Sequence, residues 1–561
     1  DTARTLTADG VISGTGQLIK TGEGTLSLSA TNTHTGGTAV NGGILSINND
    51  ANLGDASGTL SINNATVTTR AQVSSARSID ITSNATFDAG SGDWTIGSVI
   101  SGTGQLIKTS GFTLNLFGVN TYTGGTTLSS GSCGINSNES FGDVSGAVTL
   151  NSGNLVIVRA FDFTRNISLA LPSGITAAAD CTISGVISGS GSFSKAGSNT
   201  LTLTGLNTYT GGTRFQAGTC NVSSDANLGD SSGSLTFGNG TLAITSSFTT
   251  GRDIIMDGNV RIATAADLTA TGVISGFSQV IKTGPSTLTL SGSSTYTGGT
   301  AINEGTCSVS ADNNLGDPSG ALSLNASTLA VTGSFTTTRD IALTTSGTFN
   351  TSADLTANGI VSGTGQLVKT GSSTLALGGV NTYSGGTTIS AGTLQISGSS
   401  PLGSGNITID AATLSIVGSD VTSSQDIAMT SNATFNVDTS RTFSASGVFS
   451  GANQLIKTGA GTFIPSGTNT YSGGTALNGG TVQISADNQL GTGGLSFNTG
   501  ALTVAGADVT TTKTVALTTS GTLSVDTSRT LTADGVVSGT GQLIKTGAGT
   551  FIPSGTNTYS G

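Results

Sequence analysis

Apolar and polar residues alternate along this chain in short runs, and each run is followed by glycine, asparagine, aspartate or serine. Residues 25–29, Thr-Leu-Ser-Leu-Ser, show the alternation, and residues 17–20 form a short, mostly apolar run. A period of two predicts half-buried β-strands, and the residues between the runs favour turns. No window of the sequence repeats convincingly with the period of a helix. The chain is therefore expected to be all-β.

The whole pattern returns every 87 or 88 residues. Three markers give this spacing independently: the glycine of the motif (Val/Ile/Phe)-Ser-Gly, the lysine of Gln-Leu-Ile-Lys-Thr-Gly, and the aromatic residue of Asn-Thr-Tyr-Thr-Gly-Gly-Thr. They define six full repeats and part of a seventh, at 1–88, 89–175, 176–262, 263–349, 350–437, 438–525 and 526–561. The marker lysines are Lys20, Lys108, Lys195, Lys282, Lys369, Lys457 and Lys545.

Tandem repeats of short strands predict a single right-handed parallel β-helix, or β-solenoid, over residues 1–561. A coil of three strands and three turns takes about 20–25 residues, so each repeat should hold roughly four coils. Each strand then turns one face inward to a narrow core. We expect one column to be buried in every repeat: Leu6, Trp94, Cys181, Leu268, Leu355, Phe443 and Leu531.

Composition narrows the class of protein. Charged residues make up 9% of the chain, which also contains 86 glycines. An exposed wall must therefore consist of serine, threonine, asparagine and glycine. A net charge of −11 provides no basic surface for nucleic acid or anionic lipid. No run of 18 apolar residues predicts a transmembrane helix, and the first residues do not resemble a signal peptide.

The units Gly14–Gly22, Gly24–Ser29 and Asn32–Thr38, with the later Ala51-Asn52-Leu53-Gly54-Asp55, resemble the autotransporter-associated β-strand repeat. The resemblance extends over every repeat. It implies the secreted passenger of a Gram-negative type V secretion protein, mostly a right-handed parallel β-helix, often an adhesin or aggregation factor, and exported by a C-terminal outer-membrane barrel. It implies no catalytic residues.

Two sets of candidate residues share single repeat positions. The six tyrosines and the one histidine, His34, occupy the aromatic position, where we expect turn residues with a wet polar tip rather than a sugar-stacking ladder. Cys133, Cys220 and Cys307 replace leucine or valine of other repeats, and Cys181 lies in the core column. The cysteines should therefore be buried, and their spacing predicts that no disulfide joins them.

The charged positions also recur. Arg77, Arg165, Arg252 and Arg339 share a position with Gln425 and Lys513. We expect these side chains, and the marker lysines, to be locally solvated or paired with carboxylates. Asp55, Asp143, Asp230 and Asp317 follow Leu-Gly or Phe-Gly, where an aspartate caps a turn more readily than it binds calcium.

These observations predict a structural or adhesive stalk without catalytic, cofactor-binding or metal-binding residues. Its expected place is extracellular, on a bacterial surface, anchored at the outer membrane through another part of the protein. The expected partners are host or neighbouring cells, glycans or copies of itself, and not nucleic acid. Two alternatives stay open: a self-assembling filament subunit and, less favoured, a carbohydrate-active β-helix enzyme. Both chain ends have the sequence of a repeat interior, so a longer array, or end-to-end or lateral association, is a further expectation.

Overall fold

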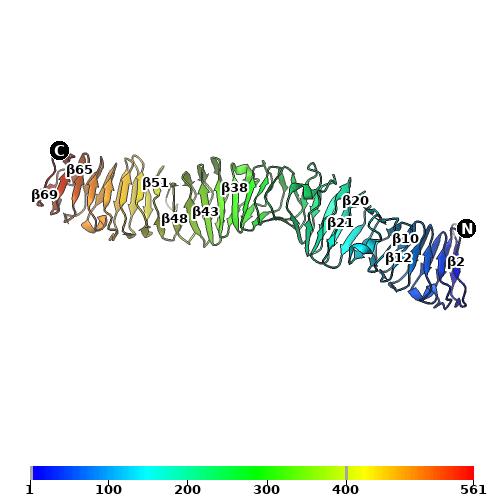
Figure 1. Ribbon diagram of the computed structural model, residues 1–561. Helices are drawn as coiled ribbons and strands as arrows, with labels where there is room; N and C mark the ends of the chain where they lie inside the picture. The colour runs from blue at the N-terminus through cyan, green and yellow to red at the C-terminus, as the bar shows by residue number, and fades with distance from the viewer. Residues whose placement is uncertain (1–3, 399–401) are drawn as a thin grey trace. The chain divides into compact units, whose positions relative to one another are not determined.

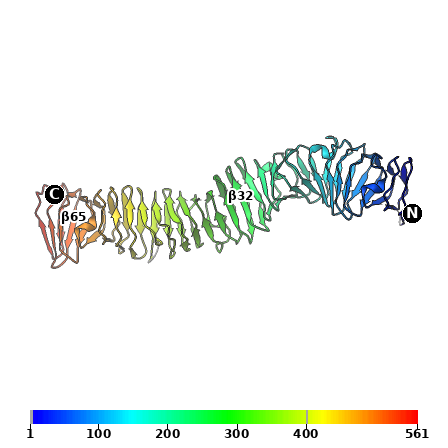
Figure 2. The same cartoon turned by 90° about the horizontal axis from the view of Figure 1, so that it is seen from below.

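A computed structural model describes residues 4–398 and 402–561 as an all-β parallel solenoid. The chain divides into two compact units, Asp1–Ser278 and Gln279–Gly561. In each unit the strands stack as successive rungs of parallel sheets (Figures 1 and 2). The all-β solenoid is confirmed, whereas a single solenoid spanning both units stays a prediction.

The first unit contains three well-developed stacks of strands. The ten-stranded sheet consists of β1 (Thr5–Ala8), β3 (Thr25–Leu28), β5 (Ile44–Ile47), β7 (Ala65–Thr69), β10 (Ala85–Asp88), β13 (Leu106–Thr109), β15 (Thr126–Leu128), β17 (Val148–Leu150), β20 (Ile167–Leu169) and β23 (Ile187–Gly189). The eleven-stranded sheet consists of β8 (Val73–Ser75), β11 (Trp94–Ile96), β14 (Thr113–Leu116), β16 (Ser132–Ile135), β18 (Asn154–Ile157), β21 (Ser173–Ala177), β24 (Phe193–Ala196), β26 (Thr213–Phe215), β28 (Leu235–Phe237), β31 (Ile254–Met256) and β34 (Ile274–Gly276). The five-stranded sheet consists of β2 (Leu18–Lys20), β4 (Thr38–Val40), β6 (Leu60–Ile62), β9 (Ile79–Ile81) and β12 (Ile100–Ser101).

The second unit is built in the same way. Its eleven-stranded sheet consists of β41 (Phe335–Thr337), β44 (Leu355–Ala357), β47 (Thr374–Leu377), β49 (Thr393–Ile396), β51 (Thr413–Ile416), β54 (Ala433–Val437), β57 (Leu455–Thr458), β59 (Thr475–Leu477), β61 (Leu495–Phe497), β64 (Val515–Leu517) and β67 (Val537–Gly539). A seven-stranded sheet runs from β52 (Val421–Ser423) to β68 (Leu543–Thr546), and β63 (Val509–Thr511), β66 (Thr530–Ala533) and β69 (Thr550–Pro553) form a smaller one.

The register shows that a repeat is longer than four coils. Thr5 pairs with Thr25, and Thr25 pairs with Ile44, so a coil takes about 20 residues. Four such coils do not use all 87 or 88 residues of a repeat, and the remaining residues form one further strand and turn. Lys20 therefore lies in the five-stranded sheet, Lys108 in the ten-stranded sheet and Lys195 in the eleven-stranded sheet. The predicted four coils are confirmed, and each repeat adds one further face.

The core is a column of aliphatic and aromatic side chains inside the coils. Trp94, Cys181, Leu268, Leu355, Phe443 and Leu531 of the predicted column are all buried. Leu6 is the exception, with 68% of its surface exposed. The prediction for Leu6 was wrong because β1 pairs only with β3, and no other strand of the described residues covers its second edge. Cys133, Cys220 and Cys307 are also buried, as predicted.

Candidate functional site: the corner of each repeat and the outer wall

One corner of most repeats is built without strands. Its short 3-10 helices are η1 (Asp50–Leu53), η2 (Asn138–Phe141), η3 (Asp225–Leu228), η4 (Asp312–Leu315) and η5 (Asp487–Leu490). In the second repeat, Asn120 lies between β12 and η2. Its Oδ1 accepts a hydrogen bond from Ile100 N at 2.8 Å, and its Nδ2 donates to Ser140 O at 2.7 Å. A buried side-chain amide thus takes the place of a strand's hydrogen bonds.

The aromatic position lies inside this corner. Tyr122, Tyr209, Tyr296, Tyr383 and Tyr471 are each 0% exposed. The hydroxyl of Tyr209 lies 2.6 Å from Thr213 Oγ1, and the Thr213 hydroxyl donates to Leu228 O at 3.1 Å. The predicted wet polar tip was therefore wrong, because the threonine four residues later gives the phenol an internal partner. Burial raises the pKa of these phenols, for Tyr383 to about 12.

His34 takes the tyrosine's place in the first repeat. It is buried, and its Nε2 lies 3.0 Å from Thr38 Oγ1, the position of the phenol–threonine contact elsewhere. The prediction that His34 substitutes for a tyrosine is confirmed. Because an imidazole enclosed in this way meets no solvent, it is a packing residue.

Six of the seven marker lysines are also inside, contrary to prediction. Lys20, Lys108, Lys195, Lys282, Lys369 and Lys457 are buried. Lys195 Nζ donates to the carbonyls of Ala196, Gly197 and Ala217 at 2.8–2.9 Å. Three turn carbonyls therefore hold the ammonium where a solvated or carboxylate-paired lysine was expected. Burial lowers the pKa of Lys20, Lys108 and Lys195, and it lowers the pKa of Lys369 and Lys457 to about 8.

The arginine position binds the 3-10 helix of the preceding coil. Arg252 Nε donates to Asp225 Oδ1 at 2.9 Å, and its terminal nitrogens donate to Gly229 O at 2.7 Å and Gly233 O at 3.0 Å. Arg77 and Arg339 pair with Asp50 and Asp312 in the same way, and Lys513 pairs with Asp487. Carboxylate pairing is confirmed for these four positions.

The carboxylates of these pairs were not predicted. Asp50, Asp225 and Asp312 each lie 27 residues before their arginine. That constant offset was the available signal, because it is one coil plus the length of the corner. Arg165 and Gln425 have no such carboxylate, since Asn138 opens η2 and the described residues form no 3-10 helix in the fifth repeat.

The outer turn aspartates accept hydrogen bonds within their own turns. Asp55 Oδ1 accepts hydrogen bonds from Ser57 N at 2.9 Å and Ser57 Oγ at 2.7 Å, and the same contacts recur at Asp143, Asp230 and Asp317. These bonds lower the pKa of Asp55. Turn capping is confirmed. Within the described residues, no group of three or more His, Cys, Asp or Glu side chains is arranged to hold a metal ion.

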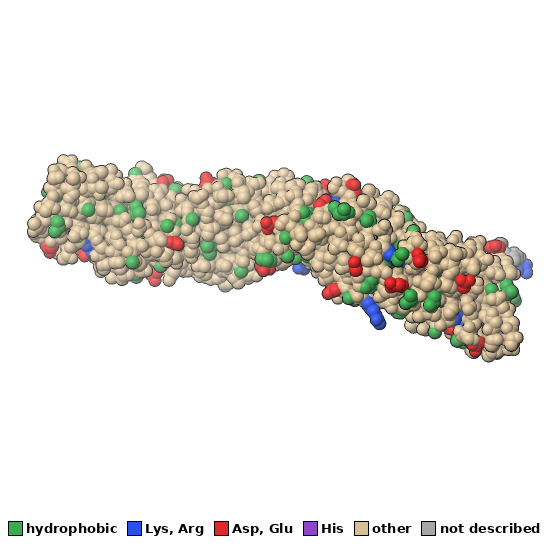
Figure 3. Space-filling model, viewed as in Figure 1, with side chains coloured by type: hydrophobic (Ala, Val, Ile, Leu, Met, Phe, Trp, Pro, Cys, Tyr) green, Lys and Arg blue, Asp and Glu red, His purple; other side chains and the backbone are tan. Residues whose placement is uncertain are grey.

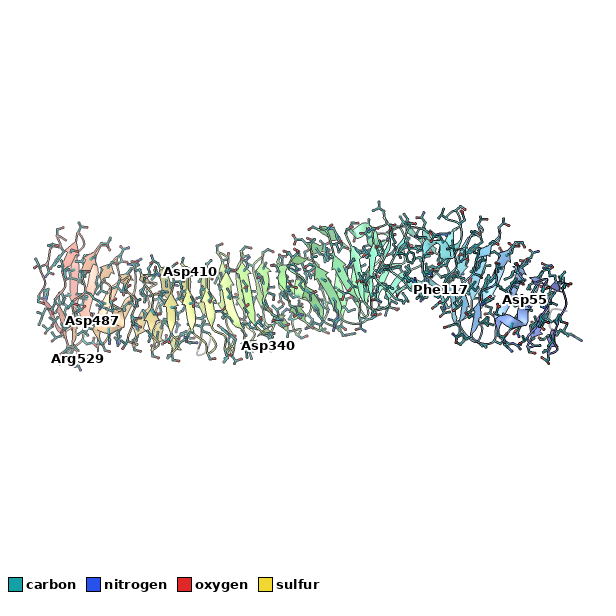
Figure 4. All side chains as sticks on the ribbon, turned by 60° about the horizontal axis from the view of Figure 1, so that its bottom comes forward. Asp55, Phe117, Asp340, Asp410, Asp487 and Arg529 are labelled. Atoms are coloured by element: carbon teal, nitrogen blue, oxygen red, sulfur yellow. The ribbon has the colours of Figure 1, made fainter. Side chains whose placement is uncertain are left out.

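Burial of the lysines and arginines removes positive charge from the outer wall. Eleven of the nineteen lysines and arginines are buried, whereas none of the described aspartates and glutamates is. Figure 3 shows the result on one face: uncharged polar side chains and backbone dominate, with scattered acidic groups and few basic ones. Figure 4 labels several of the outer acidic side chains, among them Asp55, Asp340 and Asp410. The wall is therefore acidic and rich in hydroxyl and amide groups.

The repeats of this chain match a known family of protein repeats. The profile of the passenger-associated-transport-repeat family matches residues 18–47, 106–132, 193–219, 280–306, 367–396, 455–484 and 543–561. Each of the seven repeats of the chain contains a passenger-associated-transport repeat. This confirms the resemblance to the autotransporter passenger family. Each match begins at the marker lysine strand and extends through the aromatic position, whose tyrosine or histidine is buried in the first six matches.

A curated relative supports the same family. The adhesin BmaC autotransporter of Brucella suis biovar 1 (strain 1330) is 41% identical over 129 residues. That stretch is 22% of this chain and 4% of the relative, so the chain spans only a small part of that protein. No solved structure matches the chain. The passenger repeats indicate a secreted, cell-surface protein. Among the described residues, no helix has the length and apolar character needed to cross a membrane.

Proposed function

We propose that these passenger repeats form an extracellular adhesive spacer, which holds a long polar wall against other cells, glycans or copies of itself. The observation that carries the proposal is the separation of charge: buried lysines and arginines hold the corners together, and the hydroxyl, amide and carboxylate groups remain outside. Such a wall offers many weak hydrogen-bonding positions rather than one reactive centre.

The separation of charge also selects among partners. An acidic wall repels nucleic acid, sulfated polysaccharides and anionic lipid, and it attracts no polyanion by counterion release. Uncharged glycans and protein surfaces remain as partners. We further propose that the protein is not an enzyme and that it is held at the outer membrane, by analogy with the autotransporter that it resembles over 129 residues.

Adhesion can be measured with beads that carry the full chain. We expect such beads to bind cultured cells more than beads coated with a globular protein of similar net charge. Bead–bead aggregation should rise with ionic strength, because salt screens the repulsion between acidic walls. Equal binding by both kinds of bead would contradict an adhesive function. Aggregation that falls as salt rises would contradict the proposed hydroxyl and amide contacts.

A further inference from the structure

A shallow groove of about 550 Å³ lies on the outside of the first unit, where a new stack of strands begins. Its strands are β19 (Asp162–Phe163), β22 (Cys181–Ile183), β25 (Thr200–Leu203) and β27 (Thr219–Val222). The volume falls within the roughly 300–1,000 Å³ of small-molecule sites. The groove is therefore large enough for a short chain-like ligand that lies along the wall.

The floor of the groove is a ladder of neutral hydrogen-bonding groups. Thr182, Thr202 and Asn221 are in register on three successive coils, and Thr200 lies beside them. Asn221 Nδ2 donates to Thr202 Oγ1 at 3.4 Å, while the hydroxyls of Thr182 and Thr200 bond to no other described residue. The floor thus presents free hydroxyls about one coil apart.

One wall of the groove contributes an aromatic ring, and the corner contributes a carboxylate. Phe161 is half-buried, and its ring centroid lies 6.3 Å from that of Phe163, which holds it in place. Asp180 Oδ1 accepts a hydrogen bond from Thr200 N at 2.7 Å, which orients the carboxylate beside the floor. An apolar ring edge beside hydroxyls, an amide and a carboxylate matches the alternating C–H faces and hydroxyls of a sugar.

This corner differs from the corners of the third and fourth repeats by one hydroxyl. In the third repeat, Ser247 Oγ accepts a hydrogen bond from Asp267 N at 3.1 Å, and in the fourth, Ser334 Oγ accepts one from Asp354 N at 3.2 Å. Ala160 occupies the serine position in the second repeat, so the N–H of Asp180 lacks this partner. The groove therefore has an open backbone donor where the corners of the third and fourth repeats are closed.

We propose that this groove is a binding subsite for a short neutral oligosaccharide. The proposal rests on the adhesive function proposed above and names its ligand class. Phosphorylated and sulfated ligands are disfavoured because Asp180 is the charged residue among those that line the groove. An added peptide strand is disfavoured because Asn138 already bonds the open edge of β19, accepting from Thr164 N at 3.0 Å and donating to Asp162 O at 2.7 Å.

The test uses the full chain with chitotriose, maltotriose and a sulfated trisaccharide as probes, followed by saturation-transfer NMR and calorimetry. We expect at least one neutral trisaccharide to bind and the sulfated one not to bind. Thr202→Val removes a floor hydroxyl, and Ala160→Ser supplies the missing acceptor to Asp180 N. Each should weaken binding by about threefold to tenfold, the value of one hydrogen bond.

Matched controls make the result specific. Thr289→Val changes the same position of the same Thr-Leu-Thr-Leu motif one repeat after the groove, and Ser247→Ala opens the equivalent corner of the third repeat. Neither variant should weaken binding. Circular dichroism checks that each variant folds.

The proposal is overturned if no neutral trisaccharide binds, if the sulfated probe binds best, or if Thr202→Val and Thr289→Val behave alike. Cell adhesion that survives Thr202→Val unchanged would overturn the groove's role but leave the adhesive function standing. Trisaccharide binding without cell adhesion would do the reverse.

Discussion

Arg165 and Arg252 occupy the same position in consecutive repeats but bind different sets of groups. Arg252 makes a two-point contact with Asp225 and also bonds the carbonyls that follow η3. Arg165 has no carboxylate and bonds only carbonyls, Phe141 O at 3.0 Å, Gly142 O at 2.9 Å and Gly146 O, while its Nε has no partner within the described residues.

The difference begins at the first residue of the 3-10 helix. Asn138 turns to β19 and caps its edge, whereas Asp225 turns to the arginine. Lys513 shows the opposite loss, because it keeps the carboxylate of Asp487 at 2.8 Å but makes no carbonyl contact among the described residues. The corner therefore tolerates loss of either set of contacts, and the feature common to all three is a buried cation.

The largest expected effect is that of Arg252→Met. The change removes a buried charge and leaves the Asp225 carboxylate and several carbonyls without a donor, which should cost about 3–5 kcal/mol. Chemical denaturation and hydrogen exchange of the third repeat measure the loss. The matched control is Arg261→Met, at an exposed arginine of the same repeat, which we expect to change stability by less than about 0.5 kcal/mol.

Arg165→Met should cost less, about 1–3 kcal/mol, because it leaves carbonyls but no carboxylate unpaired. Hydrogen exchange near η2 and η3 compares the two variants in one chain. Equal destabilisation by Arg165→Met and Arg252→Met would mean that the Asp225 carboxylate contributes nothing to stability. That result would contradict the difference between the two corners.

Asp225→Asn makes the third repeat resemble the second. We expect a loss of about 1–2 kcal/mol, since Arg252 keeps its carbonyl acceptors and loses only the charged partner. The reciprocal change, Asn138→Asp, gives Arg165 a carboxylate but removes the amide that caps β19. A gain in stability from Asp225→Asn, read from the unfolding midpoint, would show that the buried ion pair is a net cost.

A pH dependence is also expected of the lysine corners, which have carbonyls and no carboxylate. The pKa of Lys369 and Lys457 is about 8 in the folded chain and about 10.4 in the unfolded chain, so the unfolded state binds more protons between these values. Stability should therefore rise with pH from about 8 to about 10.4. The buried tyrosines act oppositely: their raised folded pKa makes stability fall above about pH 10.

Thermal unfolding across this range checks the sign. The double variant Lys369→Met and Lys457→Met should flatten the rise, and Lys545→Met, at an exposed lysine of the same motif, should leave it unchanged. A stability that falls steadily from pH 8 would contradict lowered lysine pKa values.

The sequence was sufficient for the strands, the coil length and the core column, because a period of two and a period of 87 or 88 residues are local and countable. It was not sufficient for Lys195 or Tyr209. Whether a polar side chain points into water or into the core depends on where turn carbonyls and threonine hydroxyls converge on it. The phenol of Tyr209 meets a threonine four residues later, and Lys195 meets carbonyls of its own turn and of the next coil. The repeat alignment shows the serine that is missing at Ala160, but not the groove beside it.

Each repeat contains one strand more than four full coils, so it ends one face further round the solenoid than the repeat before it. Within a unit, matching segments of successive repeats therefore lie in different sheets. A strand that slipped by a whole repeat would meet the wrong sheet, so the mismatch acts as a safeguard against exchange between homologous segments. It also spreads any motif that the repeats share around the circumference of a unit. We expect a surface approaching a unit from any side to meet the same chemistry, which makes attachment insensitive to the angle of approach.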